Sequence, residues 1–165
     1  MNQERQDRLI QAMILYDAGM AKQIQHFLKV YELAGLIGRM EKIPALEREI
    51  LETAAITHDI GIREALVKYG NSDGKHQEEL GPEEAGKMLK SLGYEEEIIG
   101  RVLYLIGHHH TYSNIEGKDY RILVEADFLV NLYEDNESPE AVKKAYERIF
   151  RTESGRKICK TMFTI

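Results

Sequence analysis

Cysteine is nearly absent from this sequence, and its absence limits the chemistry available to the chain. Cys159 is the only cysteine among 165 residues. A disulfide framework needs paired cysteines and a cysteine-rich metal site needs several, so both are excluded. This usage is compatible with the reducing environment of the cytoplasm, where disulfides are rare.

Long apolar runs and an excess of positive charge are also missing. No run approaches the roughly 20 apolar residues that a helix needs to span a bilayer. The start, "MNQERQDRLI", lacks the charged-then-apolar order of a signal peptide. The formal net charge of -6 and the pI of about 5.6 argue against nonspecific binding to a nucleic-acid polymer. We therefore expect a cytoplasmic protein with no membrane or nucleic-acid partner.

The remaining composition is that of a globular domain, with 43% hydrophobic and 30% charged residues. A chain of this length can bury one sizeable core, so residues 1–165 are expected to form one domain. No alternation of apolar and polar residues with a period of two persists. Between residues 20 and 39, apolar side chains instead recur near the helical spacing, at Ile24, Phe27, Leu28, Leu33 and Ile37. The sequence predicts an all-α fold, a single helical bundle.

Prolines and glycines mark the expected ends of several helices. The segment "LGPEEAGKMLKSLG" predicts a helix that begins at Pro82 and ends at Gly93, after a polar loop over residues 69–75. The segment "DYRILVEADFLVNLYED" is rich in β-branched residues, but its length favours a helix over a strand. Ser138 and Pro139 are typical of a helix start, so a further helix is expected to follow them.

Two aspartates lie in unusually apolar surroundings. The stretch "LETAAITHDIGI", residues 51–62, places His58 and Asp59 side by side, and Asp127 lies inside "LVEADFLV". A carboxylate in such a run loses hydration, which costs several kcal/mol unless another interaction offsets the loss. A bound metal ion would offset it, and so would an ordinary buried hydrogen bond.

A further histidine lies earlier in the chain, on the helix expected over residues 20–39. His26 shares one helical face with Lys22 and Lys29. Imidazole and carboxylate together are a common ligand set for a divalent metal ion. Taken alone, His26 could be a hydrogen-bonded core histidine, and Asp127 could be a helix cap or an ion-pair partner. The metal-site hypothesis depends on their order along three helices.

The order His, His-Asp, Asp resembles that of the HD-domain superfamily of metal-dependent phosphohydrolases. The segment "HFLKVYELA" is similar to the family's helix that carries the first ligand, and "AAITHDIGI" is similar to its His-Asp signature. The segment "RVLYLIGHHH" is similar to the family's apolar helix that ends in histidine, and "YRILVEADFLVN" is similar to its helix that carries the final Asp. The resemblance covers about residues 20–135. Residues 138–165 lie outside this matched core, as a helical extension that covers the bundle or forms a homodimer contact.

The resemblance implies a ligand set and a reaction. One divalent ion, of Mn, Fe, Co, Ni or Zn, would be held by His26, His58, Asp59 and Asp127. Asp59 would also be catalytic, with one oxygen on the metal and the other orienting the attacking water. The expected reaction is hydrolysis of a small phosphorylated substrate, and we expect a nucleotide.

The chain also departs from the family pattern. Members with two metal ions have another histidine where "QEELG" places Gln77, and His76 comes one residue early, about 100° away around a helix. This favours a single-metal site. The Gly-Tyr-Pro motif of the cyclic-dinucleotide phosphodiesterases is missing, and Ile62 stands where two catalytic branches carry Lys or Glu. The general acid is therefore unassigned.

Candidate substrate-binding residues come from two places. In "HHH", residues 108–110, successive helical side chains would point about 100° apart, so all three cannot reach one ion. We expect His109, and next His110, to face the pocket and hold phosphate or water, while the third is exposed or caps the helix. Lys22 and Lys29 would supply positive charge to a phosphate, unless they are solvated lysines on an outer edge.

Three hypotheses follow. The first is a metal-dependent phosphohydrolase, and the second is a sensory or regulatory module that holds a metal or nucleotide without turnover. The third is a plain helical adaptor whose His and Asp residues are core hydrogen bonders. The metal content of the purified chain separates the third hypothesis from the others. Turnover of a panel of phosphate esters separates the first from the second.

Overall fold

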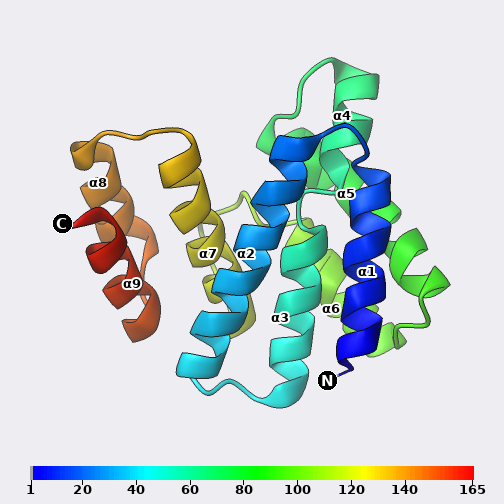
Figure 1. The fold of residues 1–165 in the computed structure, drawn as a ribbon, viewed down its shortest axis with the longest axis horizontal. Coiled ribbons are helices and arrows are strands. Elements are labelled where there is room, and N and C mark those ends of the chain that lie inside the picture. The colour runs from blue at the N-terminus through cyan, green and yellow to red at the C-terminus, as the bar shows by residue number, and fades with distance from the viewer. Residues whose placement is uncertain (1) are drawn as a thin grey trace.

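The computed structural model describes residues 2–165, and this part of the chain contains nine α-helices and no β-strand (Figure 1). The helices are α1 (Gln3–Tyr16), α2 (Ala21–Met40), α3 (Ala45–Thr57), α4 (Gly61–Tyr69), α5 (Gly74–Ser91), α6 (Glu96–Ile106), α7 (Lys118–Glu134), α8 (Pro139–Ile149) and α9 (Glu153–Phe163). The prediction of an all-α fold is confirmed.

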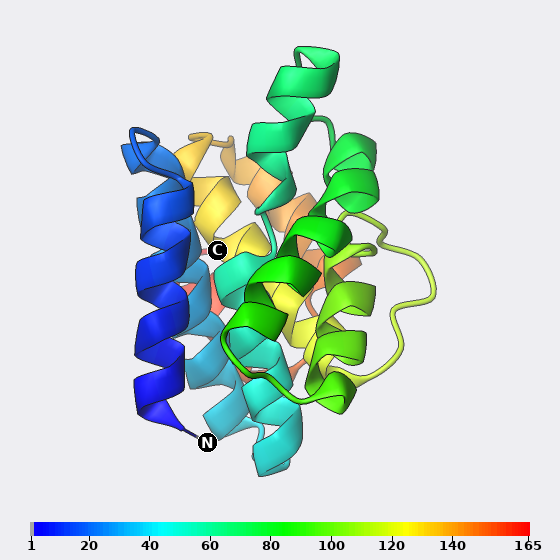
Figure 2. The same cartoon turned by 90° about the vertical axis from the view of Figure 1, so that its right-hand side faces the viewer.

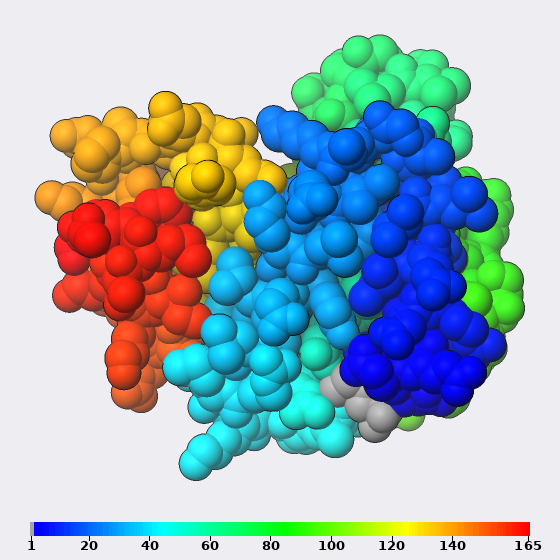
Figure 3. Space-filling view, viewed as in Figure 1, coloured from blue at the N-terminus to red at the C-terminus, as the bar shows by residue number. Residues whose placement is uncertain are grey.

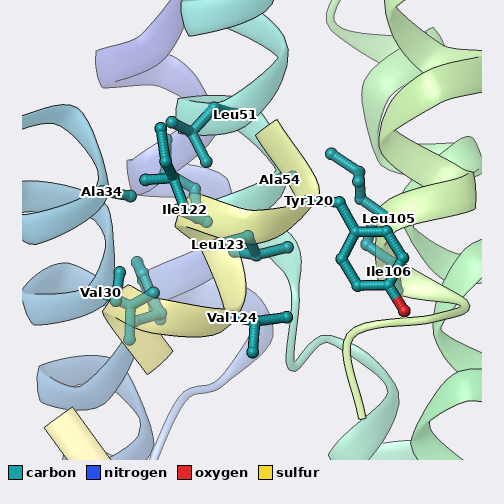
Figure 4. Packing of buried hydrophobic residues seen from close by; sticks show 14 of the residues in the cluster. Val30, Ala34, Leu51, Ala54, Leu105, Ile106, Tyr120, Ile122, Leu123 and Val124 are labelled. Atoms are coloured by element: carbon teal, nitrogen blue, oxygen red, sulfur yellow. The ribbon is translucent and has the colours of Figure 1, made fainter. Parts of the chain in front are cut away.

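Helix α7 lies at the centre of the core. It packs against α2 and α3, which also pack against each other, and α8 and α9 contact it as well. Figure 4 shows apolar side chains of three other helices together with those of α7: Val30 and Ala34 of α2, Leu51 and Ala54 of α3, Leu105 and Ile106 of α6, and Ile122, Leu123 and Val124 of α7 itself. Because α7 is covered on most sides, it has no broad polar face. This explains why its sequence also resembles a buried strand.

Helix α5 differs from the prediction at its start. It begins at Gly74 rather than at Pro82, which lies inside the helix. Proline removes one hydrogen bond from the helical ladder, but tight packing against α4 supports the turns before it. A Cβ atom added at Gly61 would lie 2.8 Å from the backbone oxygen of Gln77, so the two backbones touch. The longer helix places Gln77 on the buried face of α5.

Helices outside the central α2, α3 and α7 lie at one end and along one side of the bundle. Helix α4 projects from one end of the molecule (Figure 2). Helices α8 and α9 form the flank beside α7 and α2 (Figure 3). Ser138 caps α8 by accepting a hydrogen bond from the Ala141 backbone N–H, as its sequence predicted. Residues 138–165 thus cover one side of the bundle, and the homodimer contact stays a prediction.

Among residues 2–165, no helix combines the length and the apolar character that crossing a bilayer requires.

Candidate metal centre

The four expected metal ligands come together from three helices. His26 lies within α2, His58 and Asp59 directly follow α3, and Asp127 lies within α7. Since α2, α3 and α7 pack against one another, the fold brings these positions to one point. All four side chains are buried. Their polar atoms face one another in the interior of the bundle.

The spacing of the donor atoms fits one ion. His26 Nε2 lies 3.2 Å from Asp59 Oδ2 and 3.1 Å from Asp127 Oδ1. His58 Nε2 lies 3.3 Å and 3.4 Å from the same two oxygens. Ligands that are each about 2.1 Å from an ion lie about 3.0–3.4 Å apart at octahedral or tetrahedral angles.

The other ring nitrogen of each histidine is engaged outside the site. His58 Nδ1 donates to the backbone oxygen of Ala55 at 2.7 Å, and His26 Nδ1 donates to Glu134 Oε1 at 2.6 Å. A carbonyl or carboxylate oxygen can only accept, so Nδ1 carries the proton in both rings. Nε2 of each ring would therefore be the atom that binds a metal ion, and it would release any proton that it carries to the solvent on binding.

The charges of the centre favour a cation. Burial alone would lower the pKa of His26, but contacts with Asp127 and Asp59 outweigh burial and raise this pKa to about 10. Burial alone would raise the pKa values of Asp59 and Asp127, yet the imidazole of His58 and its neighbours hold both well below their usual range. The pocket thus stabilises positive charge between the two carboxylates.

Glu134 supports the first ligand and was not identified from the sequence. One carboxylate oxygen accepts from His26 Nδ1, and the other accepts from Lys29 Nζ at 2.7 Å. The side chain of Glu134 is only 10% exposed. Lys29, expected to bind substrate, thus holds Glu134 in an ion pair and does not line the cavity described below. Its role toward substrate stays a prediction.

Two amide side chains support the carboxylate ligands. Gln23 donates to Asp59 Oδ2 at 2.9 Å, and Asn131 donates to Asp127 Oδ1 at 3.0 Å. The sequence contained a signal for Asn131, because it follows Asp127 by four residues and so shares its helical face. The contact of Gln23 joins residues on different helices, so spacing along the chain did not reveal it.

A cavity of about 180 Å³ opens onto the centre. Lys22 lines this cavity, as expected of a residue that supplies positive charge to a phosphate, and Ile62 and Gln77 form part of its wall. Ile62 therefore gives the cavity an apolar surface where a general acid was sought. The assignment of Lys22 to substrate stays a prediction.

The three consecutive histidines lie in the turn after α6 rather than in the helix itself, and they point in different directions. His109, the first choice for the pocket, does not line the cavity. His109 is buried, its Nδ1 donates to the backbone oxygen of Ile106, and its Nε2 lies 3.3 Å from Asp59 Oδ1. His110 lines the cavity. Burial and the neighbouring His109 lower the pKa of His110 to about 4. His108 stacks on Tyr104, with ring centroids 4.1 Å apart. Binding of substrate by His109 and His110 stays a prediction.

Gln77 takes the place at the cavity that the sequence suggested. Its Oε1 lies 2.9 Å from His110 Nε2. His76 stacks on Tyr69 at 3.9 Å between centroids and contacts Asn71, so it points away from the centre.

The donor atoms form two overlapping groups. His26, His58 and Asp59 make the first, and Asp59, His109 and His110 make the second, with the donor atoms of each group within 4.8 Å of one another. Asp59 is thus shared by both groups.

Comparisons with known proteins place this geometry in a family. The sequence profile of the HD domain matches residues 24–150. The chain belongs to the HD domain family. This confirms the resemblance drawn from the sequence, and the matched residues include all four expected ligands. The profile also extends through α8, beyond residue 135 where the sequence resemblance ended.

A solved structure shares the fold of this HD-domain chain. It is the 1.45 Å crystal structure of a predicted HD superfamily hydrolase from an uncultured Thermotogales bacterium. The two chains are 23% identical and superpose with a TM-score of 0.66, over 95% of this chain and 82% of the other. No curated protein matches the sequence. The shared fold is therefore shown, while substrate and metal are not assigned by these relatives.

Proposed function

We propose that this HD-domain protein is a metal-dependent phosphohydrolase that acts on a small phosphate ester, a nucleotide, with water as the nucleophile. The observation that carries the proposal is the position of Asp59 between two groups of nitrogen donors. Its Oδ2 faces His26 and His58, and its Oδ1 faces His109. One oxygen is thus available to the ion, and the other is left for the reacting water.

The residues around Asp59 suit hydrolysis. A bound divalent ion supplies Lewis acidity, which lowers the pKa of water and polarises a phosphoryl oxygen. Asp59 Oδ1 accepts a hydrogen bond from the attacking water and orients it toward phosphorus. His109 Nε2 is buried and has no hydrogen-bond partner among the described residues, so it offers a second acceptor on the same side. Lys22 brings positive charge to the phosphate from the cavity wall.

A non-catalytic sensory or regulatory module that binds a metal or nucleotide is the second candidate. It is favoured by the apolar side chain of Ile62 in the cavity wall, at the position where two catalytic branches of the superfamily carry Lys or Glu. A leaving alcohol then has no protonated side chain assigned to it. Metal or nucleotide binding without turnover is the behaviour that this candidate predicts.

The deciding experiment is a turnover assay on purified protein loaded in turn with Mn, Fe, Co, Ni or Zn. The panel contains nucleoside monophosphates, sugar phosphates and phosphodiesters, with released phosphate or nucleoside as the readout. We expect at least one metal form to hydrolyse a member of the panel. A protein that binds metal but hydrolyses none of these esters would support the non-catalytic module instead.

The same assay tests the residue that carries the proposal. Asp59→Ala should lose the bound metal and hydrolysis together, because both oxygens of Asp59 are removed from the centre. Asp73→Ala is the matched control, since Asp73 is an exposed aspartate that lies outside the cavity. If Asp59→Ala keeps full metal content, the assignment of the site is wrong.

A further inference from the structure

A second hollow is larger than the cavity at the metal centre. It lies between α7 and α8, has a volume of about 720 Å³, and is here called the α7–α8 groove. Its apolar lining is Tyr112, Phe128, Leu132, Ala141, Ala145 and Ile149. The cavity at the metal centre has about 180 Å³, room for little more than a phosphate group and the atoms around it. The organic part of a substrate therefore needs space outside that cavity.

Helix α7 lies between the two hollows, and consecutive residues of this helix line one hollow and then the other. Asp127 and Asn131 line the metal cavity, and the residues that directly follow them, Phe128 and Leu132, line the groove. Successive residues of a helix point about 100° apart, so the groove lies on the neighbouring face of the same helix.

Tyr112 connects the lining of one hollow to the lining of the other. Its ring lines the groove, and its hydroxyl oxygen lies 3.3 Å from Nδ1 of His110, which lines the metal cavity. A substrate that reaches from the metal centre into the groove would pass these two side chains.

The groove has the chemistry of a site for a flat ring. Tyr112 is 45% exposed, and Phe128 contacts it edge-on, with ring centroids 5.1 Å apart and planes at 69°. This contact holds the tyrosine ring in place and leaves it accessible for stacking. The small side chains of Ala141 and Ala145 leave room on the α8 side.

Two cations stand at the groove without internal partners. Lys144 and Arg148 lie one turn apart on α8, both exposed, and neither forms an ion pair within residues 2–165. They can donate hydrogen bonds to ring nitrogens and carbonyl oxygens of a ligand. The groove thus combines an aromatic platform with hydrogen-bond donors, and Glu137 and Glu140 add acceptors to its lining.

We propose that the α7–α8 groove binds the nucleoside part of a nucleoside 5'-monophosphate whose phosphate occupies the metal cavity. The base stacks on Tyr112, and Lys144 and Arg148 contact its polar edge. This inference rests on the proposed function and names the substrate class of that site. A groove that instead held a second copy of the chain would behave differently in the experiment below.

The test fills the groove from the α8 side. Ala141→Trp places a large ring in the groove, and Lys143→Trp is the matched control because Lys143 is an exposed α8 residue outside it. The probes are the four ribonucleoside 5'-monophosphates and ribose 5-phosphate, which lacks the base. For the best nucleotide, kcat/KM of Ala141→Trp should fall about 10-fold or more, as expected for losing one base–aromatic stack. For ribose 5-phosphate it should stay within about 2-fold, and the control should change neither.

Binding distinguishes failure of the groove from failure of the hydrolase proposal. Calorimetric titration of the metal-loaded protein with the same four nucleotides needs no turnover. Binding that Ala141→Trp weakens and Lys143→Trp does not would support the groove even in a protein that hydrolyses nothing. No nucleotide binding, or equal losses of activity on nucleotide and ribose 5-phosphate, would overturn it. A dimer in the wild type that Ala141→Trp converts to a monomer would also overturn it, because the groove would then be an interface.

Discussion

Two buried carboxylates on α7, Glu125 and Asp127, lie two residues apart and have opposite surroundings. Glu125 Oε2 accepts from the backbone N–H groups of Arg151 and Thr152, at 2.8 Å and 3.0 Å. Its Oε1 accepts from the Thr152 hydroxyl at 2.6 Å. Both of its oxygens therefore have donors that belong to the chain.

The centre around Asp127 is composed differently. Asp127 Oδ1 accepts from Asn131, but its other close neighbours are the Nε2 atoms of His26 and His58, whose Nδ1 atoms already donate elsewhere. Imidazole nitrogens and carboxylate oxygens converge there, and a cation between them would balance the negative charge. Burial alone thus does not mark a functional carboxylate. The identity of the atoms that surround it does.

The largest effect on stability is expected from a substitution of Glu125, the carboxylate whose two oxygens both accept hydrogen bonds from the chain. Glu125→Gln keeps the size of the side chain but makes it a poorer acceptor for three donors that anchor the start of α9. The free energy of unfolding should fall by about 1–3 kcal/mol. Urea unfolding measures this loss, which should be equal with chelator and with metal, and metal content should be unchanged. A loss of metal in this variant would break the comparison between the two carboxylates.

A smaller effect, on metal affinity, is expected from Glu134, which contacts the ligand His26 but is not itself an expected ligand. Glu134→Gln removes the charge that fixes His26 Nδ1–H, so metal affinity should fall about 10–100-fold while the fold survives. Competition with a chromophoric chelator measures the affinity. Lys29→Met is the matched comparison, because it leaves the Glu134–His26 hydrogen bond in place. It should lower metal affinity less than Glu134→Gln does. Equal affinity in Glu134→Gln and wild type would mean that Glu134 does not position His26.

The smallest effect is expected at His76. This histidine stacks on Tyr69, whereas Gln77 reaches the cavity. His76→Ala should therefore leave metal stoichiometry unchanged. Metal analysis that finds two ions per chain in wild type, with one lost in His76→Ala, would contradict the single-metal site.

The sequence predicted most of the fold and the four candidate ligands that the fold brings together, for physical reasons that particular residues illustrate. Polar residues in apolar runs, such as His58 and Asp59, are visible because burial of a charge is rare without a partner. Pro82 misled the prediction of α5, because its helix continues where tight packing on α4 outweighs the lost hydrogen bond.

Contacts between distant helices could not be predicted in the same way. Lys29 and Glu134 are separated by 105 residues, and only the packing of α2 on α7 makes them partners. Spacing on α2 alone therefore suggested a lysine facing substrate. The α7–α8 groove was not predicted either, since it depends on how α8 sits against α7.

The most direct test of a metal centre at these residues is the metal-induced change in melting temperature of wild type and Asp127→Asn. Both proteins are melted with chelator and then with each of Mn, Fe, Co, Ni and Zn. Binding to the folded state raises stability by about 2.7 kcal/mol at a metal concentration of 100 times Kd. We predict that metal raises the melting temperature of wild type and raises that of Asp127→Asn little or not at all. An equal rise in both proteins, or no rise in wild type with any of the metals, would contradict the account and leave Asp127 as a structural carboxylate like Glu125.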